Sequence, residues 1–144
     1  MTTPLVDALE RISATWEALT PPDRPLEVYV EDESKKLGAD VSSHRKFAFL
    51  FPDGPNPDTE DGIEKTISEW TLSAEVFLST AGRNQREAVI AYANETSLLR
   101  RSIDKISTFP AGVLDLQVIE VRADVRGDDV IAVFTFNILA EETD

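Results

Sequence analysis

The sequence predicts a single α+β domain over residues 1–144. We expect two helices packed on a mixed, mostly antiparallel β-sheet of about four to five strands, in the order α-β-β-β-α-β-β. Three observations predict this class. Two segments repeat apolar residues at helical spacing, residues 66–79 alternate with period two, and two further strand-like segments flank a short turn near the end of the chain. A chain of 144 residues, 42% of them apolar, can bury a core of its own.

The first helix is expected to begin at Thr3 and Pro4, because threonine is a good N-cap and proline suits the first helical position. The helix should end before the two prolines at 21 and 22. We interpret Trp16 as a core anchor rather than as a platform for a ligand. Apolar residues at spacings of three and four form one stripe: Leu5, Leu9, Ile12, Trp16 and Leu19.

Three strands are expected before the second helix. Residues 26–31 alternate as a short, half-buried strand. Residues 46–51 carry Phe47, Phe49 and Phe51 on one side and apolar residues on the other, which indicates cover on both faces. Residues 66–79 form a long antiparallel strand with one buried face. That face holds Trp70, Leu72, Ala74, Val76 and Leu78.

Residues 52–62 are interpreted as a loop, because they contain three prolines, two glycines and four acidic residues. We expect a flexible acidic loop over residues 52–65 that is poorly ordered in an isolated subunit. Two interpretations stay open. The loop is a solvated excursion, or it is an arm that orders against a partner through Asp58, Glu60 and Asp61.

The second helix is predicted from Gln85 to about Ile106. Residues 84–87, Asn-Gln-Arg-Glu, have the form of a capping box at its start. The apolar stripe that follows is wide enough to lie across a sheet. It consists of Val89, Tyr92, Thr96, Leu99, Ile103 and Ile106.

The chain is expected to end in a β-hairpin. Residues 113–125 and 130–140 are its arms, joined by a four-residue turn at 126–129. A change of apolar phase in the first arm predicts a β-bulge near Val118 and Ile119. The second arm is apolar on both faces. We therefore expect Ile131 and Val133 to be covered by the first helix or by a neighbouring subunit.

Charge and composition exclude several classes of function. With 14 basic and 27 acidic residues the net charge is −13, so direct binding to nucleic acid or to an anionic membrane is not expected. The absence of cysteine excludes disulfides, thiolate catalysis and cysteine-based zinc sites. The first residues lack the features of a signal peptide, so we expect the protein to stay in the cytoplasm where it is made.

No residue pattern indicates catalysis. His44, the only histidine, is interpreted as a surface residue, and the acidic segment 58–62 fails the spacing of a calcium loop. We expect no catalytic residue, no cofactor and no metal. Arg100 and Arg101 stand out in so acidic a chain. They belong to a solvated helix face, or they meet a carboxylate on an adjacent subunit.

The pattern resembles the tail terminator, or tail-completion, proteins of long-tailed bacteriophages, and the lambdoid terminator in particular. The matching pieces are residues 5–19, the strand WTLSAEVFLS at 70–79, the capped helix at 84–106 and the ribbon at 113–141. The ending VRADVRGDDV at 121–130, followed by VFTF at 133–136, is also similar. Residues 32–43 and 52–62 have no counterpart in the family pattern.

The resemblance implies a structural virion protein made in the host bacterial cytoplasm. Such proteins form a hexameric ring that caps the tail tube, ends its polymerisation and offers a surface to the head connector, while DNA passes through the lumen. The implied partners are further copies of the chain, the major tail tube protein and the head–tail connector proteins. The residues expected to make these contacts are Asp58, Glu60, Asp61, Arg100, Arg101, Ile131 and Val133.

Three alternatives remain. Another neck component, such as a connector, a stopper or a tube-like subunit, would share ring assembly and differ in its partner. An acidic DNA mimic would use clustered carboxylates as phosphate surrogates. A small enzyme based on paired carboxylates is the third, although the sequence offers it neither a nucleophile nor a usable histidine.

Overall fold

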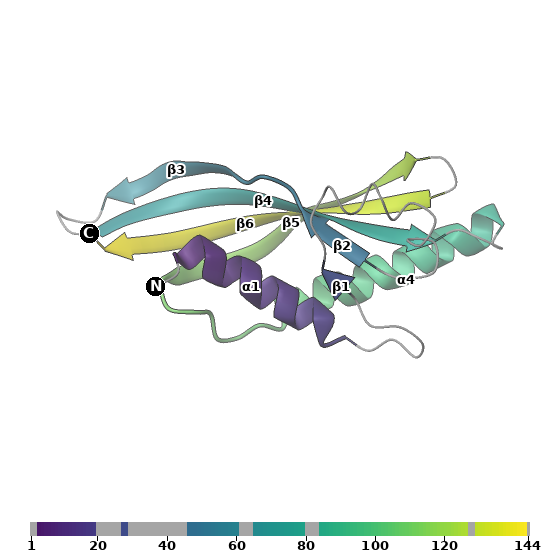
Figure 1. Cartoon of the computed structure of the whole chain (residues 1–144), viewed down its shortest axis with the longest axis horizontal. Coiled ribbons are helices and arrows are strands. Elements are labelled where there is room, and N and C mark those ends of the chain that lie inside the picture. Colours follow the sequence, from purple (N-terminus) through teal and green to yellow (C-terminus); the bar gives the residue numbers. More distant parts are fainter. Residues whose placement is uncertain are drawn as a thin grey trace.

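The computed structural model describes residues 3–19, 27–28, 46–60, 65–79, 84–126 and 129–143. Both helices lie on one face of a long, twisted sheet (Figure 1). The predicted α+β class and the predicted order of elements are confirmed, with one strand added. The elements are α1 (Pro4–Glu17), β1 (Glu27–Val28), β2 (Lys46–Phe49), β3 (Asp53–Glu60), β4 (Lys65–Ser79), α4 (Gln85–Asp104), β5 (Val113–Arg126) and β6 (Asp129–Thr143).

The sheet has the strand order β1-β2-β4-β6-β5, and β3 pairs with β4 in addition. Its backbone is the antiparallel ladder of β4 and β6, which runs from Lys65 opposite Thr143 to Ser79 opposite Asp129. Strands β2 and β3 follow one another along the same edge of β4, and the Leu50 N–H donates to the Ser73 carbonyl (2.9 Å) between them. The described sheet is therefore five strands wide although it contains six strands.

The loop prediction for residues 52–62 is wrong over Asp53–Glu60, which form β3. The strand pairs antiparallel with β4, and its register shifts between Asp53 and Asn56 and again between Pro57 and Thr59. These shifts fit prolines, which have no N–H for a ladder and are tolerated on edge strands. Composition favoured a loop, but β4 is long enough to offer an unpaired backbone edge beyond β2. Asp61 lies outside the described residues, and the predicted flexibility of this segment stays a prediction.

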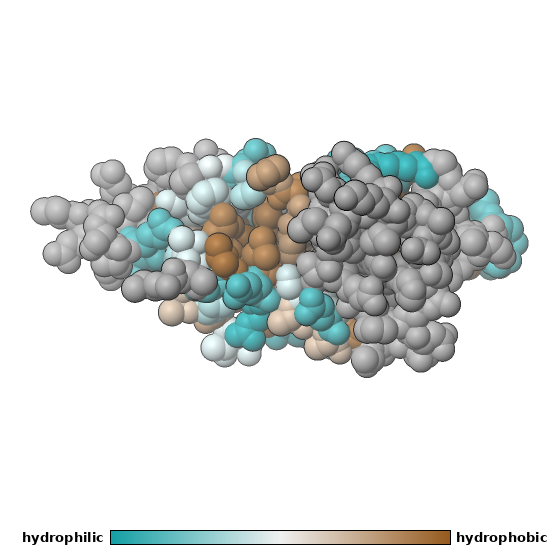
Figure 2. All heavy atoms as spheres, in the orientation of Figure 1, coloured by the Kyte–Doolittle hydropathy of each residue, from teal (hydrophilic) through white to brown (hydrophobic). Residues whose placement is uncertain are grey.

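Trp16 holds the main core together, as predicted. Its side chain is fully buried, and its ring contacts Phe47 and Phe134 edge-on, with centroids 5.0 and 5.1 Å apart. The indole N–H donates to the Leu99 carbonyl of α4 (3.3 Å), so the polar end of the ring is satisfied inside the core. One side chain thus joins α1, α4 and the sheet. In Figure 2 apolar side chains gather over the middle of the molecule, between α1 and the strands.

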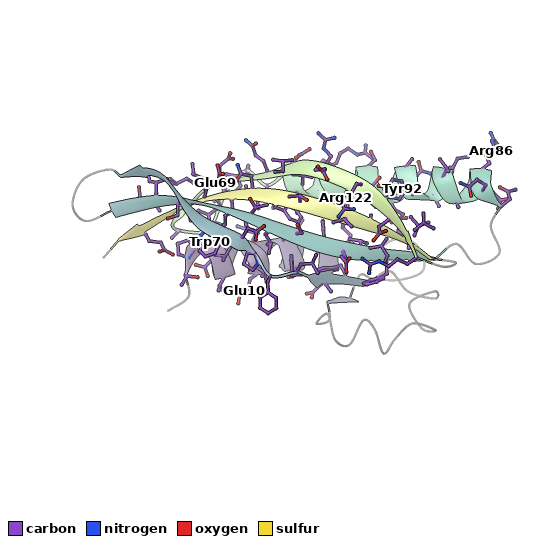
Figure 3. The ribbon with its side chains drawn as sticks, turned by 90° about the horizontal axis from the view of Figure 1, so that it is seen from above. Glu10, Glu69, Trp70, Arg86, Tyr92 and Arg122 are labelled. Carbon is purple, nitrogen blue, oxygen red and sulfur yellow. The ribbon has the colours of Figure 1, made fainter. Side chains whose placement is uncertain are left out.

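Helix α4 begins as predicted. The Asn84 side-chain oxygen accepts from the Glu87 N–H (2.8 Å), and the Asn84 amide donates to the Glu87 carboxylate (2.7 Å). Of the predicted stripe, Thr96, Leu99 and Ile103 are buried, but Val89 is 55% exposed. Figure 3 gives the reason, because the first turns of α4, marked by Arg86, project beyond the end of the sheet.

The face of the sheet opposite the helices is only partly apolar. Ala48, Phe77, Ile131 and Val133 form a second, smaller cluster there. We predicted that β4 has one buried face, but residues on its other face are buried too. Phe77 and Glu75 are only 7% and 6% exposed there. Phe51 was expected to share a face with Phe47, but β2 ends before it and it is 94% exposed.

Candidate functional site

A shallow groove lies between α4 and β5. It encloses about 320 Å³ and contains both arginines that the sequence singled out. The α4 side of the groove is polar, and a valine of β5 closes the other side. The lining residues are Thr96, Ser97, Arg100, Arg101, Asp104 and Val121.

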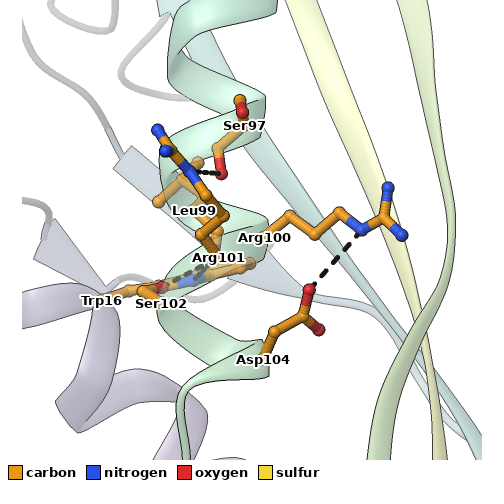
Figure 4. Close-up of polar contacts among 7 residues, drawn as sticks. All are labelled: Trp16, Ser97, Leu99, Arg100, Arg101, Ser102 and Asp104. Atoms are coloured by element: carbon orange, nitrogen blue, oxygen red, sulfur yellow. Dashed lines mark hydrogen bonds and ion pairs between the residues drawn. The ribbon is translucent and has the colours of Figure 1, made fainter.

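The two arginines leave α4 in different directions (Figure 4). Arg100 extends toward the strands, and its Nε lies 3.8 Å from Asp104 one helical turn on. Arg101 reaches back along the helix, where its Nε donates to the Ser97 carbonyl (3.3 Å). The Arg100 and Asp104 side chains are 61% and 52% exposed, so their ion pair stabilises the helix by only about 0.3–0.5 kcal/mol. Both guanidinium groups lie at the surface, where a carboxylate of a partner can reach them.

The fold fixes the position of this groove through α4. Leu99 sits between Arg100 and the core, and its carbonyl accepts from both Trp16 and the Ser102 hydroxyl (2.6 Å) (Figure 4). Thr96, on the same face, donates its hydroxyl to the Tyr92 carbonyl (2.8 Å). The buried side of the helix is therefore held against the sheet while the arginines lie on its exposed side. Partial burial of Tyr92 raises the pKa of its hydroxyl, because burial disfavours the charged form.

A second polar arrangement lies on the face of the sheet opposite the helices, and the sequence did not reveal it. Arg126, at the end of β5, donates through Nη2 to Glu75 of β4 (2.6 Å) and through Nε to Asp124 (2.9 Å). Burial lowers the pKa of Arg126, but the hydrogen bonds and charges of Glu75 and Asp124 outweigh it and raise the pKa above its usual value. A raised pKa keeps the arginine charged, so its contribution to stability is lost only as the pH rises through that value.

This arrangement compensates the charge of a buried carboxylate. Glu75 is buried, and Arg126 reaches it across β6 and closes over its carboxylate. A buried carboxylate needs such a partner, since leaving it unpaired is costly. The only hint in the sequence is a glutamate on the polar side of the strand at 66–79, because its partner lies 51 residues away.

The other predicted contact residues are placed as follows. Asp58 and Glu60 belong to β3. Ile131 and Val133 are 1% and 3% exposed within the chain itself, in the small cluster with Ala48 and Phe77. The first helix does not cover them, because α1 packs on the opposite face with Phe134 and Phe136. The chain buries them without a neighbouring subunit, and a contact with a partner stays a prediction.

No three histidine or acidic side chains among the described residues are arranged to hold a metal ion. None of the described helices has the length and apolar character needed to cross a bilayer. His44 lies outside the described residues. Asp129, at the start of β6, is the backbone register partner of Arg126.

Comparison with known proteins assigns no family. No protein-family model matches the chain, and no curated protein matches its sequence.

Proposed function

We propose that this chain is a structural virion protein of the tail-terminator type. It would form a ring at the head-proximal end of a phage tail tube, end tube polymerisation and provide the surface for head attachment. The observation that carries the proposal is the order and form of its elements. An amphipathic helix, a long strand, a capped helix of 20 residues and a long two-stranded ribbon follow one another in α1, β4, α4 and β5–β6. These are the pieces on which the resemblance to terminators rests.

The charge of the chain is consistent with this role. Six copies of a chain with net charge −13 carry 6 × (−13) = −78. A ring with this net charge repels the phosphates of DNA, so the duplex can pass through its lumen without sticking. The same repulsion opposes ring closure at low salt, so we expect the ring to form on a tube as template or at raised ionic strength.

The groove between α4 and β5 supplies positive charge in this acidic chain. In an acidic ring, Arg100 and Arg101 are well placed to receive a carboxylate of the adjacent subunit, because both lie at the surface on one helix. Such a pair would fix the register between neighbours more than it would add affinity. Exchanging both arginines for glutamate should therefore prevent ring formation on tubes and leave the subunit folded.

Deletion of the gene from its phage tests the proposal. Loss of a terminator predicts tails of uncontrolled length without heads attached, seen by electron microscopy. Tails of normal length that lack heads would instead identify the chain as a connector or stopper of the neck. Phage that assembles normally without the chain would contradict both neck roles.

A further inference from the structure

The two long edges of the described sheet differ in their protection. Strand β3 lies on one edge and contains Pro55 and Pro57, which cannot donate a backbone hydrogen bond. Strand β5 forms the other edge over 14 residues; it contains no proline or lysine, and its two register shifts lie before Val121. An edge strand directs the N–H and C=O groups of alternate residues outward, and proteins usually block such an edge with these devices. The edge of β5 is thus open to another strand.

The segment of β5 from residue 120 to residue 126 is the accessible part of this edge. A bulge between Val118 and Glu120 precedes it, and the hairpin pair of Arg126 with Asp129 closes it. Its side chains are exposed on both faces of the sheet. Arg122 is 60% exposed on the face opposite the helices, and Val125 is 69% exposed on the helix side. Three of the seven exposed large apolar residues in the described chain lie on β5, namely Leu114, Ile119 and Val125.

The sequence of this segment, EVRADVR, is complementary to itself in antiparallel register. When two copies are centred on Ala123, Arg122 lies opposite the second copy's Asp124, and Glu120 lies opposite its Arg126. By symmetry each copy contributes both pairs, so four opposite-charge pairs form on one face. Arg126 is 52% exposed and keeps its bonds to Glu75 and Asp124 within its own chain. On the other face Val121 lies opposite the second copy's Val125. Opposite charges and apolar pairs directly across a ladder stabilise it.

The two nearest registers, centred one residue to either side, lose this match. Centring the pair on Arg122 sets that arginine against its own copy and Glu120 against Asp124. Centring it on Asp124 sets that aspartate against itself and Arg122 against Arg126. Like charges directly opposite one another destabilise a ladder. The register about Ala123 also pairs the whole segment between the bulge and the hairpin end, with no residue left over.

We infer that β5 is a self-association edge, at which a second copy of this chain adds its own segment 120–126 to make a symmetric dimer. The axis of such a pair is perpendicular to the sheet. Both copies of α4 therefore lie on the same face of one continuous sheet. Figure 3 shows β5 as the outermost strand on the side of α4.

The inference does not rest on the proposed function. A two-fold contact cannot belong to a head-to-tail ring, since each ring subunit uses two different surfaces. In a terminator the dimer would be the form of the free chain, and the edge would separate before ring assembly. A chain with another role would dimerise in the same way.

A charge exchange across the edge tests the inference. Light scattering of the wild-type chain at high micromolar concentration and moderate salt should give about 32 kDa, twice the mass of one chain of 16.0 kDa. Arg122→Glu faces Asp124 of its partner, and Asp124→Arg faces Arg122. Each variant alone should dimerise on the order of tenfold more weakly or worse. An equimolar mixture restores opposite charges at every pair and should recover the dimer.

The control is Lys105→Glu, which makes the same change of charge at the end of α4, away from the strand. Its dimer should match the wild type. A monomeric wild type, a dimer unchanged by Arg122→Glu, or a mixture no better than either variant would overturn the inference. A hexamer insensitive to Arg122→Glu would overturn the strand pairing and leave the ring proposal intact. Where a variant fails to fold, hydrogen exchange of the wild type decides, because the amides of 120–126 should be protected only at concentrations where the dimer forms.

Discussion

The two faces of the sheet are built in different ways. The helix side is apolar and aromatic, with Trp16 packed edge-on against Phe47 and Phe134 and its indole N–H bonded to the Leu99 carbonyl. The opposite side carries a small apolar cluster and a carboxylate, Glu75, that depends on an arginine from another strand. The first face makes the fold stable. The second fixes the end of the hairpin, where the open edge of β5 lies.

The largest effect is expected from breaking the helix side. Trp16→Ala removes the ring that joins α1, α4 and the sheet, and it leaves a cavity that the rigid strands cannot fill. We expect a loss of about 3–5 kcal/mol in the free energy of unfolding, measured by urea denaturation. Val6→Ala changes a 39% exposed residue on the same helix and should lower the free energy of unfolding by less than about 1 kcal/mol. Equal losses for the two variants would show that Trp16 is not the anchor.

A smaller effect is expected on the opposite face. Glu75→Gln keeps the shape of the side chain but loses its charged bond to Arg126. We expect about 1–3 kcal/mol of destabilisation. Arg126→Gln and the double variant complete a cycle, and the coupling between the two positions should be at least about 1 kcal/mol because they bond directly. Additive losses would show that this contact contributes nothing. Dilute samples, with the β5 edge unpaired, keep the cycle free of dimerisation.

The smallest of these effects is expected at the start of α4, whose first turns lie beyond the end of the sheet. Asn84→Ala removes the cap of α4 at the end that projects beyond the sheet. We expect a loss of about 1 kcal/mol. Hydrogen exchange should show the loss as fraying of the first turns, with the amides near Leu99 still protected. Uniform loss of protection along α4 would mean that the helix unfolds as one unit.

The elements with strong periodicity were predictable. Residues 66–79 alternate over many positions, and the capping box at Asn84 is a local signal, so β4 and the start of α4 lie where the sequence indicated them. The bulge was also predictable, because the apolar phase of the first arm changes at the point where the register shifts between Val118 and Glu120. Each of these features is encoded within a few neighbouring residues.

The failures involve long-range pairing. Strand β3 has the composition of a loop and becomes a strand only because β4 offers an edge. Glu75 lies on the polar side of its strand, and no neighbouring residue in the sequence indicates that Arg126 is its hydrogen-bond partner. Ile131 and Val133 were expected to be covered by the first helix or by a neighbouring subunit, but α1 packs on the other face and the chain buries them with Ala48 and Phe77. The self-complementary charges of residues 120–126 are visible in the sequence, but only the strand order of the sheet shows that this segment lies on an edge.

The claim that this molecule works by assembly is tested most directly on tail tubes. Purified chain is added to growing tubes of the major tail protein, and tube lengths and ends are measured by electron microscopy. We expect a ring at one end of each tube and an arrest of growth, with no arrest by a variant in which Arg100 and Arg101 are both changed to glutamate. Tubes that grow to the same lengths with and without the chain, and with bare ends, would contradict it.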